Sequence, residues 1–204
     1  MGSVGNNNQD LQEALQYYRE DGYYINSILR HEGEEDNLYE IDDKERYYIS
    51  LLDKATNGSS VKQDTLYRIV DSSVVFGKMS DIDSDNLRAH LLFGDNAYDR
   101  GEYSQGIKAR MEKIVDKMKD KVVDEKGFMS TTSTYEEAMD KYSDSTHSSY
   151  NGVILELKNT KGLKGVDMGG DEHEVLLKRG YKYKFKKAKV RDNMVIIETE
   201  IVRS

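Results

Sequence analysis

The chain has 204 residues and carries 38 acidic against 30 basic side chains, for a formal net charge of −8. This excess of negative charge argues against nucleic acid as a bulk partner, because phosphates would be repelled. The sequence contains no cysteine, which excludes disulfides and thiolate metal sites. No run approaches the roughly 20 apolar residues of a membrane-spanning helix.

The N-terminal residues 1–8 are polar and lack the apolar stretch of a signal peptide. Export by another machinery, excision from a longer polypeptide and retention in the producing cell all stay open. We interpret 1–8 as a tail, either disordered or added by cloning. Residues 9–204 have the length of a single domain, with a helical part at 9–60 and a strand-rich part at 61–204.

Apolar residues recur at helical spacing in the first part. Leu11, Leu15 and Tyr18 predict one helix, which is broken at 21–22. A second helix is expected to end near 31–33. Asp42-Asp43 would cap a third helix, which ends at Asn57-Gly58.

The later part is richer in short runs that predict strands. Strands are expected at 66–70, 74–77, 128–132, 153–157 and 174–177, and a closing hairpin at 181–190 and 194–202. Helices are expected at 84–93, 107–122 and 135–142, and a Ser-rich loop at 143–151. Helices first and strands later predict an α+β fold.

Familiar metal and nucleotide motifs are absent. The run Asp81–Asp85 begins like a calcium loop, but its sixth position is Asn86 and its twelfth is Leu92, which has no ligating oxygen. The four histidines are dispersed, which speaks against zinc. The nucleophile elbow, the P-loop and the dinucleotide fingerprint do not occur.

The most informative local feature is Glu172-His173-Glu174, followed by the apolar run 175–177. Residues i and i+2 of a strand share a face, so both carboxylates would point into one space while Val175 and Leu177 face the core. Two acids in one pocket suit a reaction that passes through a cation. The preceding run, 165–171, is glycine-rich and predicts a flexible loop. Glu-x-Glu also occurs at 32–34 and 198–200, so the pair alone favours a solvated strand edge over a catalytic site.

Three segments in fixed order resemble the Arg–Ser–Glu class of ADP-ribosyltransferases, in particular the bacterial exoenzyme and toxin family. They are Tyr67-Arg68, the Phe-Met-Ser-Thr-Thr run at 128–132, and Glu172-x-Glu174. The run Tyr24–Arg30 is similar to the family's Ile-Asn-x-x-Leu-Arg helix, and Phe76-Gly77 stands at a similar distance after the arginine. The resemblance covers residues 10–202 and includes the catalytic domains of actin-modifying binary toxins and Rho-modifying exoenzymes. It implies N-terminal helices packed on two mixed or antiparallel sheets that form an NAD cleft.

The resemblance implies a set of NAD-binding residues. Arg68 would hold a phosphate of NAD, and the backbone of Ile69 would hold the nicotinamide amide. Tyr142 lies where relatives place an aromatic ring against the nicotinamide, although a core role is equally compatible with the sequence. Asn26 and Arg30 would reach the adenine side of NAD or fix the helix that carries them.

The resemblance also implies the catalytic residues. Ser130 would position Glu174, while Thr131 and Thr132 would shape the floor of the cleft. Glu174 would stabilise the cation that forms when the nicotinamide leaves. Glu172 would act on the acceptor, since Glu at this position goes with arginine acceptors in the family and Gln with asparagine acceptors.

Two features depart from the family pattern. Relatives often carry a second basic residue after the nicotinamide aromatic, but no arginine occurs between Arg110 and Arg179. Lys141 or His147 could take its place, or NAD could bind weakly. The run 165–171 is short and lacks an aromatic residue, so the protein target cannot be copied from better-known relatives.

The resemblance therefore predicts a mono-ADP-ribosyltransferase that moves ADP-ribose from NAD to an arginine of a target protein and releases nicotinamide. We expect NAD as a substrate, no metal, a monomeric chain, an unknown target protein, and secretion or delivery into a target cell. Two alternatives stay open. One is an NAD glycohydrolase that uses water as the acceptor, and the other is a degenerate transferase fold that serves as a binding module.

Overall fold

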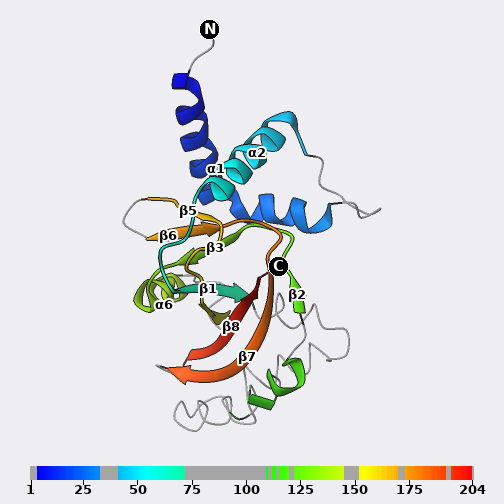
Figure 1. Cartoon of the computed structure of the whole chain (residues 1–204), viewed down its shortest axis with the longest axis vertical. Coiled ribbons are helices and arrows are strands. Elements are labelled where there is room, and N and C mark those ends of the chain that lie inside the picture. The colour runs from blue at the N-terminus through cyan, green and yellow to red at the C-terminus, as the bar shows by residue number, and fades with distance from the viewer. Residues whose placement is uncertain are drawn as a thin grey trace. The chain divides into compact units, whose positions relative to one another are not determined.

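The computed structural model describes residues 4–32, 41–71, 109, 112–113, 115–119, 122–144, 152–169, 173–191 and 194–203 (Figure 1). The chain forms two compact units. Unit 1 comprises Met1–Lys62, Asp124–Ser130 and Lys161–Tyr181, and unit 2 comprises Gln63–Val123, Thr131–Thr160 and Lys182–Ser204. The predicted strand at 74–77, the predicted helix at 84–93 and most of the predicted loop lie outside the described residues.

Unit 1 begins with a long helix, α1 (Val4–His31), which is bent at Asp21 (Figure 1). Asp21 has φ −139° and ψ 31°, which are not helical values. A Cβ on the next residue, Gly22, would lie 3.1 Å from the ring of Tyr18, so the glycine lets this ring pack closely. The predicted break at 21–22 is therefore confirmed. The helix begins at Val4, inside the range 1–8 that was interpreted as a tail.

The second helix of unit 1, α2 (Asp43–Gly58), starts with a capping box. The backbone N–H of Glu45 donates to Asp42 Oδ1 (2.7 Å), and the backbone N–H of Asp42 donates to Glu45 Oε2 (2.9 Å). Two donors that a helix start leaves unpaired are satisfied in this way. The predicted cap and the predicted end at Gly58 are both confirmed.

Buried residues of α1 and α2 form the core of unit 1. The ring of Tyr18 meets the ring of Phe128 edge-on, with centroids 5.9 Å apart. The cluster consists of Ala14, Leu15, Tyr18, Ile25, Leu29, Tyr48, Ile49, Leu51, Leu52, Phe128, Met168 and Leu176. Because Phe128, Met168 and Leu176 belong to it, the helices are packed against the strands that carry the candidate site.

Unit 1 also contains a strand pair that the sequence analysis partly missed. Strand β5 (Gly165–Asp167) pairs antiparallel with β6 (Glu174–Leu177), with Asp167 opposite Val175. The prediction of a flexible run was therefore wrong for 165–167. A Cβ on Gly165 would lie 2.9 Å from the carbonyl oxygen of Leu176, so this glycine permits close backbone approach within a strand.

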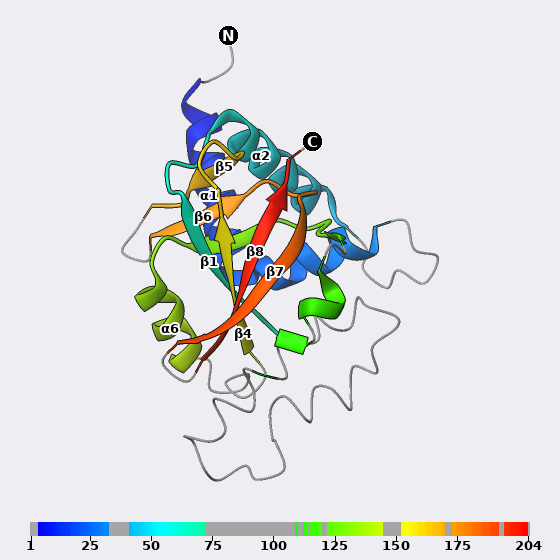
Figure 2. The same cartoon turned by 60° about the horizontal axis from the view of Figure 1, so that its bottom comes forward.

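Unit 2 holds a mixed sheet in the order β2-β7-β8-β4-β1-β3. Its strands are β1 (Thr65–Asp71), β2 (Val122–Asp124), β3 (Met129–Thr132, whose last two residues belong to this unit), β4 (Gly152–Lys158), β7 (Lys182–Arg191) and β8 (Met194–Val202). Strands β4 and β8 are parallel, while β1 pairs antiparallel with β4, as β7 does with β8. Figure 2 shows β1, β4, β8 and β7 as successive neighbours. The predicted α+β class and the predicted hairpin strands are confirmed.

One predicted boundary in unit 2 was wrong. Val122 was expected at the end of a helix over 107–122, but it opens strand β2 and is 53% exposed. Its apolar side chain continued the helical spacing by coincidence. Among the described residues of this stretch, 109, 112–113 and 115–118 are helical, and Val115 and Met118 are buried, as predicted.

Helix α6 (Tyr135–Asp144) packs its apolar face on the sheet of unit 2. The shared core consists of Tyr135, Ala138, Ile154 and Ile196, with Tyr67, Ile69 and Met139 packed against it. Residues 135–142 were predicted to be helical, and they are. Among the described residues, no helix is both long and apolar enough to cross a membrane.

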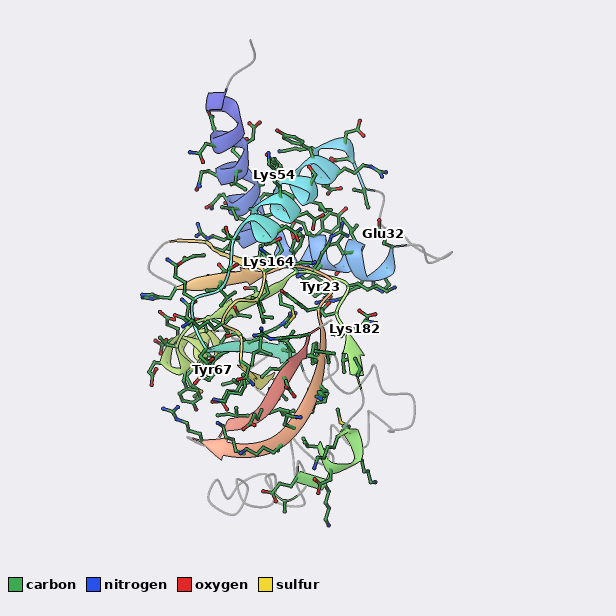
Figure 3. All side chains as sticks on the ribbon, in the orientation of Figure 1. Tyr23, Glu32, Lys54, Tyr67, Lys164 and Lys182 are labelled. Atoms are coloured by element: carbon green, nitrogen blue, oxygen red, sulfur yellow. The ribbon has the colours of Figure 1, made fainter. Side chains whose placement is uncertain are left out.

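The sheet of unit 2 buries the carboxylate of Glu156 on β4, which is 5% exposed. Lys189 donates to Glu156 Oε2, and Lys158 Nζ lies 3.1 Å from Oε1. The Tyr67 hydroxyl donates to Oε1 at 3.4 Å; Figure 3 shows Tyr67 on β1. Burial raises the pKa of Glu156, but hydrogen bonds from Lys189 and Lys158 outweigh this effect and hold it below its usual 4.5.

This buried carboxylate makes stability depend on pH. A lowered pKa in the folded chain means that the ionised Glu156 stabilises the fold above pH 4.5 and that this contribution is lost as pH falls below that value. We predict that Glu156→Gln lowers the free energy of unfolding by about 1–3 kcal/mol at pH 7, and that the difference from wild type shrinks below pH 4.5. Urea unfolding from pH 3 to pH 7 measures this.

Glu136→Gln is the matched control, because Glu136 pairs with Arg191 in the same unit but is 74% exposed. Exposed ion pairs contribute about 0–1 kcal/mol, so this variant should stay close to wild type throughout. A difference between wild type and Glu156→Gln that stays constant from pH 7 to pH 3 would contradict the assignment.

Candidate active site

The structure brings together Ser130 and Glu174 within unit 1. Ser130 lies on β3, and Glu174 is the first residue of β6. The hydroxyl of Ser130 donates to Glu174 Oε1 at 2.5 Å. This short hydrogen bond holds the carboxylate in place. Glu174 is 6% exposed, so its carboxylate is also largely removed from water. A buried carboxylate interacts more strongly with a nearby cation than an exposed one does.

The backbone before Glu174 differs from the predicted strand. His173 has φ 44°, which is the left-handed region, so the chain is not extended there. The argument that Glu172 and Glu174 share a strand face required an extended His173, and that argument was wrong. Glu172 itself lies outside the described residues. All four residues of β6 are buried, so Val175 and Leu177 face a core as expected, and the face that carries Glu174 is buried as well.

The other two Glu-x-Glu pairs differ from Glu174 in their surroundings. Glu198 pairs with Lys187, and Glu200 pairs with Lys186 and Lys184, all on the neighbouring strand β7. Glu32 is 62% exposed and lies at the end of α1 (Figure 3). Only Glu174, among the described members of the three pairs, combines burial with a serine partner from another strand.

Arg19 is a component that the sequence analysis missed. It lies on α1 just before the bend, and its Nη2 donates to the carbonyls of Met168 and Gly169, the latter at 2.7 Å. Its Nε lies 3.8 Å from Glu174 Oε2. Arg19 is about 150 residues from these partners in the sequence, and no motif marks it, so only the fold could reveal the contact.

Asn26, on the second half of α1, holds the chain that leads into β3. It is 6% exposed. Its Oδ1 accepts the backbone N–H of Phe128 at 2.8 Å, and its Nδ2 donates to the Tyr18 hydroxyl at 2.9 Å. A Cβ on Gly127 would lie 2.6 Å from Asn26 Oδ1, so only glycine fits beside this amide.

Arg30, one turn further on, holds the same segment through Glu125. Its Nε and Nη2 donate to the two carboxylate oxygens of Glu125 at 2.9 and 3.2 Å. Glu125 is fully buried and also accepts the backbone N–H of Gly127 at 3.0 Å. Asn26 and Arg30, which were predicted to approach NAD or to fix their helix, thus both contact the segment that ends at Ser130.

The remaining predicted residues lie in unit 2. Arg68 is buried on β1, Ile69 packs against the core beneath α6, and β1 pairs with β3 so that Tyr67 lies opposite Thr132. Thr131 and Thr132 are buried, and the hydroxyl of Thr132 donates to Glu137 Oε2 at 2.5 Å. Tyr142 and Lys141 lie on α6, but the structure does not describe their side chains. His147 lies outside the described residues.

A family model described as ADP-ribosyltransferase exoenzyme matches residues 4–203. The chain belongs to this family. The resemblance inferred from the sequence motifs is thereby confirmed, and membership supports NAD-dependent transfer of ADP-ribosyl groups as the activity.

Solved structures of the same fold agree with this membership. C3stau2 from S. aureus, solved with NAD, has a TM-score of 0.69 at 20% identity, over 96% of this chain and 88% of that chain. The Clostridium limosum C3 exoenzyme has a TM-score of 0.61 at 20% identity, over 95% and 85%. The ADP-ribosyltransferase Vis in complex with agmatine has a TM-score of 0.57 at 18% identity, over 98% and 76%. A comparison with curated protein sequences finds no match.

The packing of Gly127 against Asn26 can be tested by mutation. We predict that Gly127→Ala destabilises the fold by about 1–3 kcal/mol, because the new methyl group displaces a buried amide from its hydrogen bonds. Gly58→Ala is the control, since a Cβ there would meet nothing within 4 Å, and it should be neutral or slightly stabilising. Thermal and urea unfolding of both variants measure the effect. Equal stability of the two variants would contradict the predicted crowding.

Proposed function

We propose that this protein is a mono-ADP-ribosyltransferase that transfers ADP-ribose from NAD to the guanidinium group of an arginine in a target protein. The observation that carries the proposal is the buried carboxylate of Glu174, held by Ser130 at 2.5 Å. Family membership supplies the reaction class, and the site supplies a group suited to its difficult step.

That step is cleavage of the bond between the nicotinamide nitrogen and C1 of the ribose. The bonding electrons leave with the nitrogen, so nicotinamide departs as a neutral molecule and the sugar becomes an oxocarbenium cation, as in glycoside cleavage. A carboxylate bound to a ribose hydroxyl stabilises this cation more than it stabilises the ground state. At about 4 Å and an effective dielectric constant near 20, the attraction is of order 4 kcal/mol, or roughly a thousandfold in rate.

NAD would be held by the residues that match the family motif. In this proposal Arg68 binds a phosphate, because its guanidinium presents paired donors to phosphate oxygens. The backbone of Ile69 binds the nicotinamide amide, Tyr142 packs against the nicotinamide ring, and Thr131 and Thr132 form the floor of the site.

Asn26 and Arg30 contribute to NAD binding mainly by placing Ser130. Their polar groups contact Phe128 and Glu125 in the segment that ends at Ser130. These contacts favour the positioning role over direct recognition of the adenine.

The acceptor is proposed from Glu172. An arginine guanidinium is cationic and a poor nucleophile until it is oriented and loses a proton. A second carboxylate two residues before Glu174 in the sequence suits both needs: it would bind the guanidinium and take the proton as the nitrogen bonds to C1 of the ribose. The structural relative Vis was solved with agmatine, a small molecule that carries the same guanidinium group, which supports this acceptor class.

A toxin or effector role follows from the names of the relatives. Matching structures include Plx2a, described as an ADP-ribosyltransferase toxin from Paenibacillus larvae, with a TM-score of 0.61 at 21% identity. We propose that this chain likewise acts on a protein of another cell after secretion or delivery, and that it works as a monomer.

Replacing Glu174 by Gln tests the catalytic role. Gln keeps the shape and can still accept the hydrogen bond from Ser130, but it loses the charge. We predict that NAD hydrolysis and transfer both fall by about a thousandfold, as measured by nicotinamide release and by labelling of an arginine acceptor. Glu200→Gln is the control, because Glu200 belongs to a Glu-x-Glu pair that is neutralised by lysines, and it should keep full activity. Near-wild-type activity of Glu174→Gln would remove the basis of the proposal.

Replacing Glu172 by Gln separates transfer from hydrolysis. We predict that Glu172→Gln loses modification of agmatine and of protein arginines by at least about tenfold, because the proton acceptor is lost, while NAD hydrolysis persists. Labelled NAD with and without agmatine measures both products in one reaction. If both reactions fall together, Glu172 does not act on the acceptor. If wild type releases only free ADP-ribose with every acceptor, the protein is an NAD glycohydrolase.

A further inference from the structure

Arg19 contacts both ends of one short segment. Its Nη2 donates to the carbonyls of Met168 and Gly169, directly after β5, and its Nε lies 3.8 Å from the carboxylate of Glu174, the first residue of β6. The backbone N–H of Met168 donates to the carbonyl of Glu174 at 2.9 Å, so β5 and β6 meet where Arg19 lies. One side chain therefore touches the residues before and after the segment that contains Glu172 in the sequence.

The guanidinium group suits this double contact. Its donors lie in one plane as a rigid fork, so Nη2 can serve two carbonyls while Nε faces a carboxylate. A lysine in its place would keep the positive charge, but its one nitrogen could not serve the two carbonyls and face the carboxylate at the same time. The contact with Glu174 at 3.8 Å is longer than a hydrogen bond. Oε2 consequently keeps its capacity to accept a hydrogen bond from a substrate hydroxyl.

The two carboxylate oxygens of Glu174 thus face different partners. Oε1 accepts the hydroxyl of Ser130, and Oε2 faces Arg19. Serine alone would leave the carboxylate free to rotate about that hydrogen bond. The charge of Arg19 on the other side favours one orientation of the carboxylate plane.

We propose that Arg19 is a positioning residue with two separable effects. Its charge orients the carboxylate of Glu174 for cleavage of NAD, and its bonds to the carbonyls of Met168 and Gly169 hold the guanidinium beside that carboxylate. The inference rests on the proposed function, because it assigns Glu174 to cleavage of NAD.

Two substitutions separate the effects. Arg19→Lys keeps the charge near Glu174 but loses the fork that fixes it there, so NAD hydrolysis and transfer to agmatine should each fall by about threefold. Arg19→Met loses both, so hydrolysis and transfer should each fall by about tenfold or more, since a misplacement of about 1 Å can cost on the order of a hundredfold. The losses should appear in kcat, and the KM for NAD should stay within about twofold.

Arg179→Met is the matched control. The Arg179 side chain is 34% exposed against 33% for Arg19, and it makes a two-pronged ion pair with Asp53 in the same unit. None of the contacts described for Arg179 involves Met168, Gly169 or Glu174. If the loss of any arginine ion pair from unit 1 lowered activity, Arg179→Met would lose activity too. Our proposal instead predicts that Arg179→Met keeps wild-type rates and has a lowered unfolding midpoint.

The measurement is steady-state release of nicotinamide and of ADP-ribosyl-agmatine from NAD by the full chain. Wild-type rates for Arg19→Met, or a loss matched by Arg179→Met, would overturn the proposal. An Arg19→Lys variant equal to wild type in both reactions would overturn the role of the carbonyl bonds, and one as impaired as Arg19→Met would overturn the role of the charge. If Arg19→Met does not fold, Arg19→Lys decides alone. If wild type itself releases no nicotinamide, the proposed function fails rather than the role of Arg19.

Discussion

The hydrogen bond from Ser130 to Glu174 is the interaction on which the candidate site depends. It joins two strands that are 44 residues apart in the sequence and fixes a carboxylate that is 6% exposed. Both residues lie beside contacts made by α1. The second half of the helix fixes the segment before Ser130 through Asn26 and Arg30, and the first half reaches Glu174 through Arg19.

The bend at Asp21 divides these two tasks within one helix. Arg19 lies before the bend and Asn26 after it. The close packing of Gly22 against Tyr18 links the bend to the core, because Tyr18 also meets Phe128 and the amide of Asn26. A helix that would otherwise count only as an N-terminal appendage is therefore part of the candidate site.

The sequence predicted the parts that depend on local physical chemistry. The helix cap at Asp42, the break at Asp21 and the hairpin of β7 and β8 all follow from short-range rules, and the structure contains them. The motif resemblance to the family was confirmed as well.

Errors arose where a local signal has more than one physical cause. Gly165 was taken as a mark of flexibility, but it permits close backbone approach in β5. His173 was assumed to be extended, but it adopts a positive φ that only its surroundings can impose. Arg19 gave no signal at all, because a single arginine on an amphipathic helix is ordinary until the fold brings Met168 and Glu174 beside it.

The central claim is that the buried carboxylate at Glu174 serves cleavage of NAD and transfer of ADP-ribose to a guanidinium. The most direct measurement is incubation of the wild-type chain with NAD labelled in its ADP-ribose part, together with agmatine, followed by mass spectrometry of the products. Our account predicts nicotinamide and ADP-ribosyl-agmatine, with the adduct on a guanidinium nitrogen. Intact NAD after prolonged incubation with folded protein would contradict it.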